Sequence, residues 1–108
     1  MEHNINRTTQ KVALVTGASG GIGAAVATRL VEAGWQVAVH YQSNQAKAKA
    51  LADKLNAISA GSAEIFGADV ASEAEVERLV ASVVETFGGL NGLVNNAGII
   101  TPVGTIQD

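Results

Sequence analysis

One stretch near the N-terminus constrains the fold more than any other: residues 12–23, which read VALVTGASGGIG. It opens with a short apolar run rich in β-branched residues, residues 12–15, which is typical of a parallel strand covered on both faces. The chain then turns through glycines and enters residues 22–33, where apolar residues recur at helical spacing. Glycines let the backbone approach an anion, and the first N–H groups of a helix have no partner within it. A strand, glycine turn and helix in this order can therefore cradle a phosphate.

The spacing of the glycines in this turn is G-x-x-x-G-x-G, formed by Gly17, Gly21 and Gly23. It differs in order from the G-x-G-x-x-G fingerprint of dinucleotide-binding turns. The chain holds 12 glycines, so the motif alone also fits a tight turn that binds nothing. Its position between a predicted strand and a predicted helix favours a ligand.

The rest of the chain alternates predicted strands and helices. We expect strands at residues 12–16, 35–41, 63–67 and 90–95, and helices at residues 22–33, 45–58 and from the S-x-x-E capping box at Ser72 to Phe87. In the first helix the predicted core stripe is Ile22, Val26, Leu30 and Ala33, and Leu51, Leu55 and Ile58 supply the apolar face of the second. Residues 96–108, with Gly98, Pro102 and Gly104, are predicted to be loop-like.

This alternation predicts an α/β fold with right-handed βαβ units and a parallel sheet. The expected architecture is the first half of a Rossmann-type doubly wound sheet, with strand order 3-2-1-4 and a nucleotide crevice between strands 1 and 4. In that arrangement strand 90–94 is an apolar edge. Exposed edges of this kind invite association, so we expect the chain alone to be oligomeric or poorly soluble.

Composition excludes several classes of function. Ten acidic against seven scattered basic residues give a net charge of −3, so no nucleic-acid surface is expected. There is no cysteine, and two histidines, His3 and His40, are too few to predict a metal site. No run approaches the roughly 20 apolar residues of a membrane helix. We expect a cytoplasmic protein without a membrane partner, with a disordered tail at residues 1–10 and one domain portion at residues 11–108.

Three motifs together resemble the short-chain dehydrogenase/reductase family, in order and at close to its spacing: TGASGGIG at residues 16–23, Asp69-Val70, and Asn95-Asn96-Ala97-Gly98. The likeness covers about residues 11–100, and is strongest to the 3-oxoacyl-carrier-protein reductases and glucose dehydrogenase-like members. It implies an NAD(P)-binding Rossmann domain, of which this chain is the N-terminal portion.

The resemblance also implies roles for individual residues. The glycine turn would line the pyrophosphate and adenosine ribose of NAD(P), through Gly17, Ser19, Gly20, Gly21, Ile22 and Gly23. Asp69 would hydrogen-bond the adenine amino group, with Val70 beside the ring. The nicotinamide-side ribose would lie along Asn95, Ala97 and Gly98, while Asn96 would tie neighbouring strands together. From the residues alone, Asp69 is equally a turn residue before a helix, and the Asn95-Asn96 pair equally a strand-ending turn.

The end of the second strand bears on the choice of cofactor. An acid about 20 residues past the glycine turn binds the ribose 2′-OH of NAD. Residues 39–44, VHYQSN, contain no acid, which favours NADP(H) and leaves NAD possible. Tyr41 and Ser43 belong to this part of the predicted site, and Ser43 and Asn44 could donate to a 2′-phosphate. Gly20 stands where similar reductases often carry a cation, which weakens the preference.

The catalytic residues that the family uses are not found in these 108 residues. The family pairs a tyrosine with a lysine as Tyr-x-x-x-Lys, but Tyr41 is followed by Gln45 at that spacing. We therefore expect no catalytic or metal-binding residue here, and interpret the chain as the cofactor-binding part of a longer NADP(H)-dependent oxidoreductase. That protein would act on a small carbonyl or alcohol substrate and form a homo-oligomer, commonly a tetramer in this family. The alternative is a stand-alone or catalytically inactive nucleotide-binding module.

Overall fold

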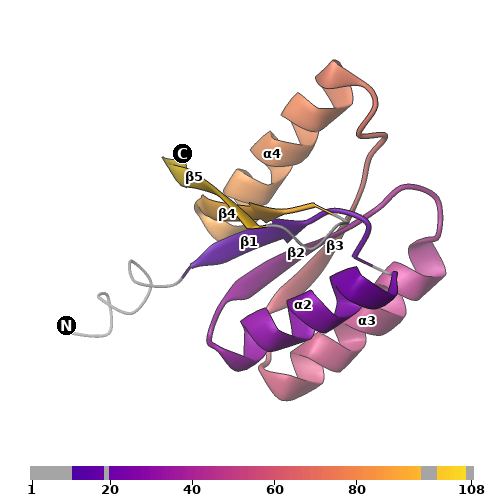
Figure 1. The fold of residues 1–108 in the computed structure, drawn as a ribbon, viewed down its shortest axis with the longest axis vertical. Helices are drawn as coiled ribbons and strands as arrows, with labels where there is room; N and C mark the ends of the chain where they lie inside the picture. The colour runs from indigo at the N-terminus through magenta and orange to yellow at the C-terminus, as the bar shows by residue number, and fades with distance from the viewer. Residues whose placement is uncertain (1–10, 19, 96–99, 107–108) are drawn as a thin grey trace.

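The protein is a three-layer α/β structure in a computed structural model that describes residues 11–18, 20–95 and 100–106. A five-stranded sheet forms the middle layer. Helices α2 (Gly21–Glu32) and α3 (Gln45–Ile58) cover one face of the sheet, and α4 (Glu73–Phe87) covers the other (Figure 1).

The strand order confirms the predicted topology. The strands are β1 (Val12–Val15), β2 (Gln36–Tyr41), β3 (Ala63–Gly67), β4 (Leu90–Val94) and β5 (Ile100–Ile106), arranged β3-β2-β1-β4-β5. The first four are parallel, so their order is 3-2-1-4 as expected of a Rossmann-type sheet. Their carboxyl ends lie along one edge of the sheet, where β1 and β4 are neighbours.

The fifth strand corrects one prediction. Residues 100–106, expected as part of a loop, form a strand antiparallel to β4, with Leu93 opposite Thr101 and Val94 opposite Ile100. The β-branched residues of ITPVGTI suit a strand, and Pro102 is tolerated because β5 lies at the edge of the sheet. β4 is therefore paired on both sides, so the prediction that it forms an exposed edge is wrong.

Two apolar clusters, one on each face of the sheet, form the core. Side chains of α2 and α3 pack against Val15, Val37 and Val39, whereas α4 packs against Leu14 and Ala38 on the opposite face. On α4 the apolar residues at helical spacing face the sheet: Leu79, Val83 and Val84 are buried, and Val76, Val80 and Phe87 are partly buried.

The predicted core stripe of α2 is right in part: Val26 and Leu30 are partly buried and pack against the core, but the fully buried row lies one position further along the helix. The buried residues are Gly23, Ala27 and Val31, while Ile22 is 59% exposed and Ala33 is also exposed. Both sets have the same spacing on adjacent rows of the helix, so periodicity does not separate them. The row with the smaller residues faces the sheet because it lets the helix backbone approach closely. Ile58 of α3 is likewise exposed rather than part of the core.

The helix starts differ in how they are capped. Asn44 caps α3 by accepting from the Lys47 N–H, and Ser72 caps α4 by accepting from the Glu75 N–H. The Glu75 side chain does not complete the capping box, since its Oε1 accepts from the Asp69 N–H instead. The start of α2 has no side-chain cap among the residues that the structure describes.

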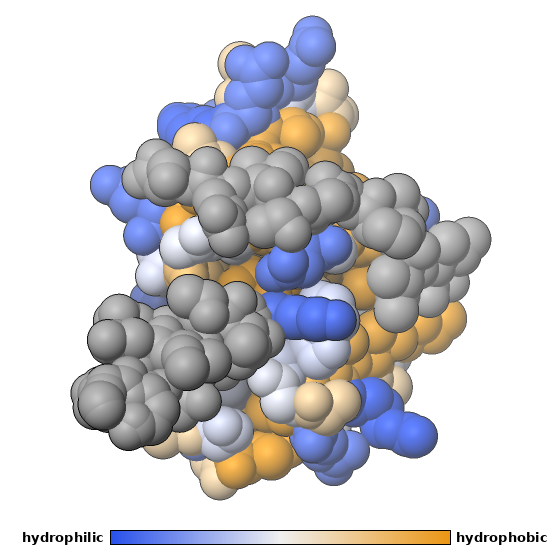
Figure 2. All heavy atoms as spheres, turned by 90° about the vertical axis from the view of Figure 1, so that its left-hand side faces the viewer, coloured by the Kyte–Doolittle hydropathy of each residue, from blue (hydrophilic) through white to orange (hydrophobic). Residues whose placement is uncertain are grey.

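The surface is mixed rather than uniformly polar. In Figure 2 hydrophilic side chains gather at the top of the molecule, where α4 begins, with hydrophobic surface below them. Within residues 11–18, 20–95 and 100–106, none of the helices has the length and apolar character to span a membrane.

Candidate functional site

The glycine turn lies where β1 and β4 end. The Thr16 N–H donates to the Val94 carbonyl at 2.9 Å, which fixes the end of β1 against the end of β4. Gly17 follows with φ of +62°, a left-handed conformation that favours glycine, and its carbonyl accepts from the Gly20 N–H at 3.2 Å. The predicted turn is thus closed by its own backbone, and α2 starts at its far end.

The glycines at 21 and 23 serve different purposes. A Cβ added at Gly23 would lie 2.7 Å from the Gly17 carbonyl oxygen and 2.8 Å from the Ala18 Cα, so Gly23 lets α2 pack directly on the turn. A Cβ at Gly21 would meet no atom within 4 Å among the described residues. Packing therefore requires glycine at 23 but not at 21, where the space beside the backbone is open.

The amides at the start of α2 are available to a ligand. The Gly20 carbonyl accepts the first helical bond from the Ala24 N–H, so the N–H groups of Gly21, Ile22 and Gly23 precede the first residue with a partner inside the helix. No acidic side chain stands in this first turn, and no described side chain caps it. Gly20, Gly21 and Ile22 are exposed. This end of the helix can attract and hold an anion.

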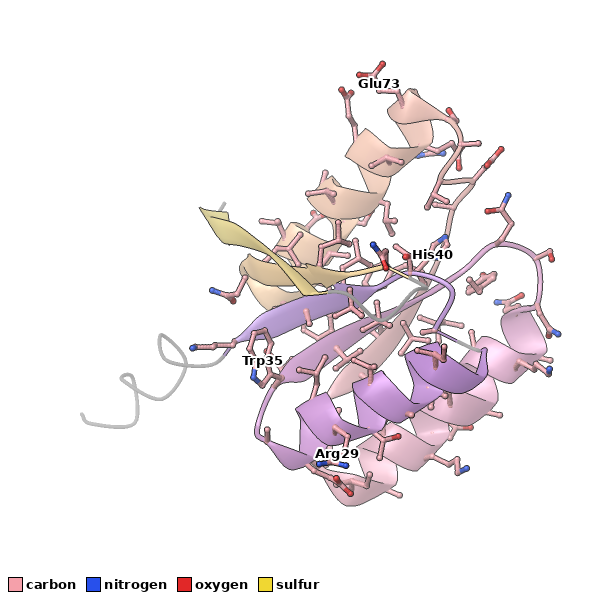
Figure 3. The ribbon with its side chains drawn as sticks, viewed as in Figure 1. Arg29, Trp35, His40 and Glu73 are labelled. Carbon is pink, nitrogen blue, oxygen red and sulfur yellow. The ribbon has the colours of Figure 1, made fainter. Side chains whose placement is uncertain are left out.

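A residue that the sequence did not single out joins the turn to the rest of the site. His40, in β2, is 2% exposed, and its Nδ1 accepts from the Gly17 N–H at 3.1 Å. Its Nε2 lies 2.8 Å from the Ala68 carbonyl oxygen. In Figure 3 His40 lies near the middle of the molecule, whereas Arg29, Trp35 and Glu73 lie toward its periphery. The only signal in the sequence was a titratable residue directly after the apolar run Val37–Ala38–Val39.

Asp69 and Val70 follow β3 and are both exposed. Asp69 Oδ1 accepts from the Ala71 N–H at 3.0 Å and from Gln42 Nε2 at 3.1 Å. These two bonds, the Ala71 one foremost, favour the carboxylate and lower the pKa of Asp69 below its usual value of 3.8. The side chain therefore does act as the turn residue considered above, while remaining ionised and accessible.

Val70 borders an apolar recess of about 280 Å³ on the α4 side of the sheet. Thr16 and Leu93 also line the recess, from the ends of β1 and β4, together with Leu14, Val76, Leu79, Val80 and Leu90. Val70 is 44% exposed and Ile22 59%, so two of the three large hydrophobic residues exposed among the described residues are predicted cofactor contacts.

Of the remaining predicted site residues, three are described by the structure and four are not. Tyr41 is half-buried at the end of β2 with its ring against Gly67, where an added Cβ would come within 2.7 Å of the ring, and Ser43 is exposed in the following turn. Asn95 is exposed directly after β4. The predictions for Ser19, Asn96, Ala97 and Gly98 lie outside the described residues.

Comparison with known proteins decides the family. The model of the short chain dehydrogenase family matches residues 11–108, nearly the whole chain. The chain belongs to the short-chain dehydrogenase family. This confirms the resemblance to that family which the three motifs suggested.

Individual relatives agree with the short-chain dehydrogenase assignment. The chain is 47% identical over 89 residues to the 3-oxoacyl-[acyl-carrier-protein] reductase FabG of Staphylococcus aureus, which covers 82% of this chain and 36% of that protein. It is 46% identical over 90 residues to a short-chain dehydrogenase/reductase of Armillaria gallica, covering 82% and 34%. An uncharacterized oxidoreductase of Methylorubrum extorquens is 45% identical over 89 residues, covering 82% and 36%. The alignment thus spans about a third of the length of these relatives.

Proposed function

We propose that this chain is the dinucleotide-binding part of an NADP(H)-dependent oxidoreductase that moves a hydride between the nicotinamide ring and a carbonyl or alcohol substrate. The chain's own residues would hold and orient the cofactor, which supplies the hydride chemistry when bound. The relatives named as a 3-oxoacyl-[acyl-carrier-protein] reductase and as oxidoreductases support this reaction class. A homo-oligomeric whole protein is part of the proposal.

The observation that carries the proposal is the open start of α2. The N–H groups of Gly21, Ile22 and Gly23 stand at the carboxyl end of β1, beside β4, where the strand order reverses. In α3 and in α4 one N-terminal amide donates to the side chain of the capping residue, whereas no described side chain accepts from the first amides of α2. A diphosphate would satisfy these donors and gain from the positive end of the helix dipole.

We assign the adenine end of the cofactor to Asp69 and Val70. Both hydrogen bonds of the Asp69 side chain involve Oδ1, so Oδ2 is the oxygen that we assign to the adenine amino group. Val70 offers an exposed apolar surface for the face of the ring. Apolar contact with one directed acceptor is the usual composition of such a pocket.

The preference for NADP over NAD rests on charge. Residues 37–52 contain no carboxylate and carry two exposed cations, Lys47 and Lys49, on the first half of α3. Because a carboxylate would repel a 2′-phosphate, its absence favours NADP. The exposed hydroxyl of Ser43 is available as a donor to that phosphate, and Asn44 keeps its amide NH₂ for the same purpose while Oδ1 caps α3.

The proposal is tested by calorimetric titration of the 108-residue chain with NADP⁺ and NAD⁺. We expect NADP⁺ to bind more tightly, and Gly21→Asp to weaken binding by about tenfold or more, because the new carboxylate faces the diphosphate. Gly21 has room for a side chain, so the variant should fold. The matched control, Ala25→Asp, adds the same charge at an exposed position one turn along α2 and should bind almost normally.

The cofactor preference has its own variant. Ser43→Asp places an acid at the end of β2 and should weaken NADP⁺ binding while sparing NAD⁺. Equal loss in Gly21→Asp and Ala25→Asp, or no binding of either nucleotide to the wild type, would contradict the proposed function.

A further inference from the structure

His40 joins the two segments to which the diphosphate and the adenine of the cofactor are assigned. Its ring accepts from the Gly17 N–H in the glycine turn and contacts the Ala68 carbonyl, one residue before Asp69. Its own carbonyl accepts from the Ala18 N–H at 3.2 Å, so both Gly17 and Ala18 are bonded to this one residue. No other described residue hydrogen-bonds the glycine turn through a buried side chain.

The hydrogen bonds fix the form of the ring. Nδ1 faces an N–H donor and must accept, while Nε2 faces a carbonyl oxygen and must donate. Only the neutral tautomer with its proton on Nε2 satisfies both partners. An apolar residue of similar size would fill the same space in the core, but it would leave the Gly17 N–H and the Ala68 carbonyl without these bonds.

The bond to Gly17 acts on the conformation that the phosphate site needs. Gly17 has φ of +62°, and its carbonyl in turn accepts from the Gly20 N–H, which sets the direction in which α2 begins. Holding the Gly17 N–H therefore limits the backbone freedom of the turn before any ligand arrives. A turn ordered in advance loses less entropy on binding.

We propose that His40 is a positioning residue for the dinucleotide: its Nδ1 orders the glycine turn for the diphosphate, while the bond from its Nε2 to the Ala68 carbonyl holds the ring in place. This rests on the proposed function, since it names what prepares the same site. His40 is buried and both ring nitrogens are occupied, so it does not touch the cofactor. Its effect on binding passes through Gly17.

Two substitutions separate this role from that of a core residue. In His40→Asn the amide oxygen can replace Nδ1 as acceptor for Gly17, while the contact to Ala68 is lost. In His40→Gln the longer side chain can replace Nε2 as donor to Ala68, while the acceptor for Gly17 is lost. Each variant gives up one of two hydrogen bonds, so a purely structural residue would show similar losses in both.

The two variants are compared with the wild-type chain by NADP⁺ titration and by amide hydrogen exchange of Gly17. We expect His40→Gln to weaken NADP⁺ binding about threefold to tenfold, which is the change in affinity that corresponds to the net free energy of one hydrogen bond. The same variant should speed hydrogen exchange at the Gly17 amide. His40→Asn should stay within about twofold of the wild type in both. Equal affinities, or equal losses, in the two variants would overturn the role while leaving the proposed function standing.

Failure of the proposed function and failure of the role of His40 give different results. A wild-type chain that binds no nucleotide would overturn the proposed function, and this inference with it. If His40→Gln does not fold, wild type labelled with ¹⁵N-histidine provides the test. The expected spectrum shows His40 protonated on Nε2 alone, with an Nδ1 resonance that moves when NADP⁺ is added. A proton on Nδ1, or an Nδ1 resonance unmoved by saturating NADP⁺, would overturn the role.

Discussion

Gly23→Ala is the substitution for which the structure gives the most definite expectation. The added methyl group would lie 2.7 Å from the Gly17 oxygen and 2.8 Å from the Ala18 Cα, and both are backbone atoms that cannot rotate away. Overpacking of this kind costs about 1–3 kcal/mol. Replacing a helical glycine by alanine also stabilises the helix by up to about 1 kcal/mol. We therefore expect a net loss of about 1–2 kcal/mol.

Gly21→Ala is the matched control. It lies in the same turn of α2, but its new Cβ meets nothing within 4 Å among the described residues. Stability should be unchanged or raised by up to about 1 kcal/mol. Urea unfolding followed by circular dichroism measures both variants. In a domain of this size, 1 kcal/mol corresponds to about 4–8 °C in Tm, so heating should separate them clearly. If the two variants were equally stable, the close approach of α2 to the turn would be refuted.

Three further predictions concern the scaffold and the adenine end of the site. Asn56 pairs with both the N–H and the carbonyl of Ala63 at the start of β3, so Asn56→Ala should cost about 1–3 kcal/mol in urea unfolding. Leu55 is fully buried, and Leu55→Ala should cost about 2–5 kcal/mol by the same measurement, where a loss below 1 kcal/mol would contradict its place in the core. The Asp69 carboxyl should titrate by NMR below pH 3.8, with Gln42→Ala moving its pKa back toward that value. Because the folded-state pKa is lowered, the stability that Asp69 contributes is present above pH 3.8 and is lost as pH falls through the folded-state value.

The central strands and the helices could be predicted from the sequence because their signals are local and agree with one another. Each of three segments is compatible with one type of secondary structure only: the apolar run at residues 12–15, the glycine turn, and the amphipathic residues of α4. Alternation of the elements then leaves few topologies, and the observed order 3-2-1-4 is the one that the handedness of βαβ units favours.

Two features of the fold could not be predicted because they depend on packing partners. β5 contains Pro102 and Gly104, which usually signal a loop, and forms a strand because β4 offers it an edge to pair with. On α2, Ile22 and Gly23 begin rows of equal spacing, and the choice between them depends on how closely the helix approaches the turn.

The site shows the same division between local and long-range information. The glycine turn and Asp69 were recognisable from motifs, because the residues that define each are adjacent in the chain. His40 was not, since its bonds to Gly17 and Ala68 join residues 23 and 28 positions away. A lone histidine beside an apolar run could not be distinguished from a simple core residue without these two partners.

The most direct test of the central claim is an NMR titration of the ¹⁵N-labelled chain with NADP⁺, read at the backbone amides. We expect the largest shifts at Gly21, Ile22 and Gly23, with only small shifts at the far end of α3, at Ala57 and Ile58. Saturable binding whose largest shifts lie elsewhere, with the amides of residues 21–23 unmoved, would contradict the claim that the open start of α2 grips the diphosphate.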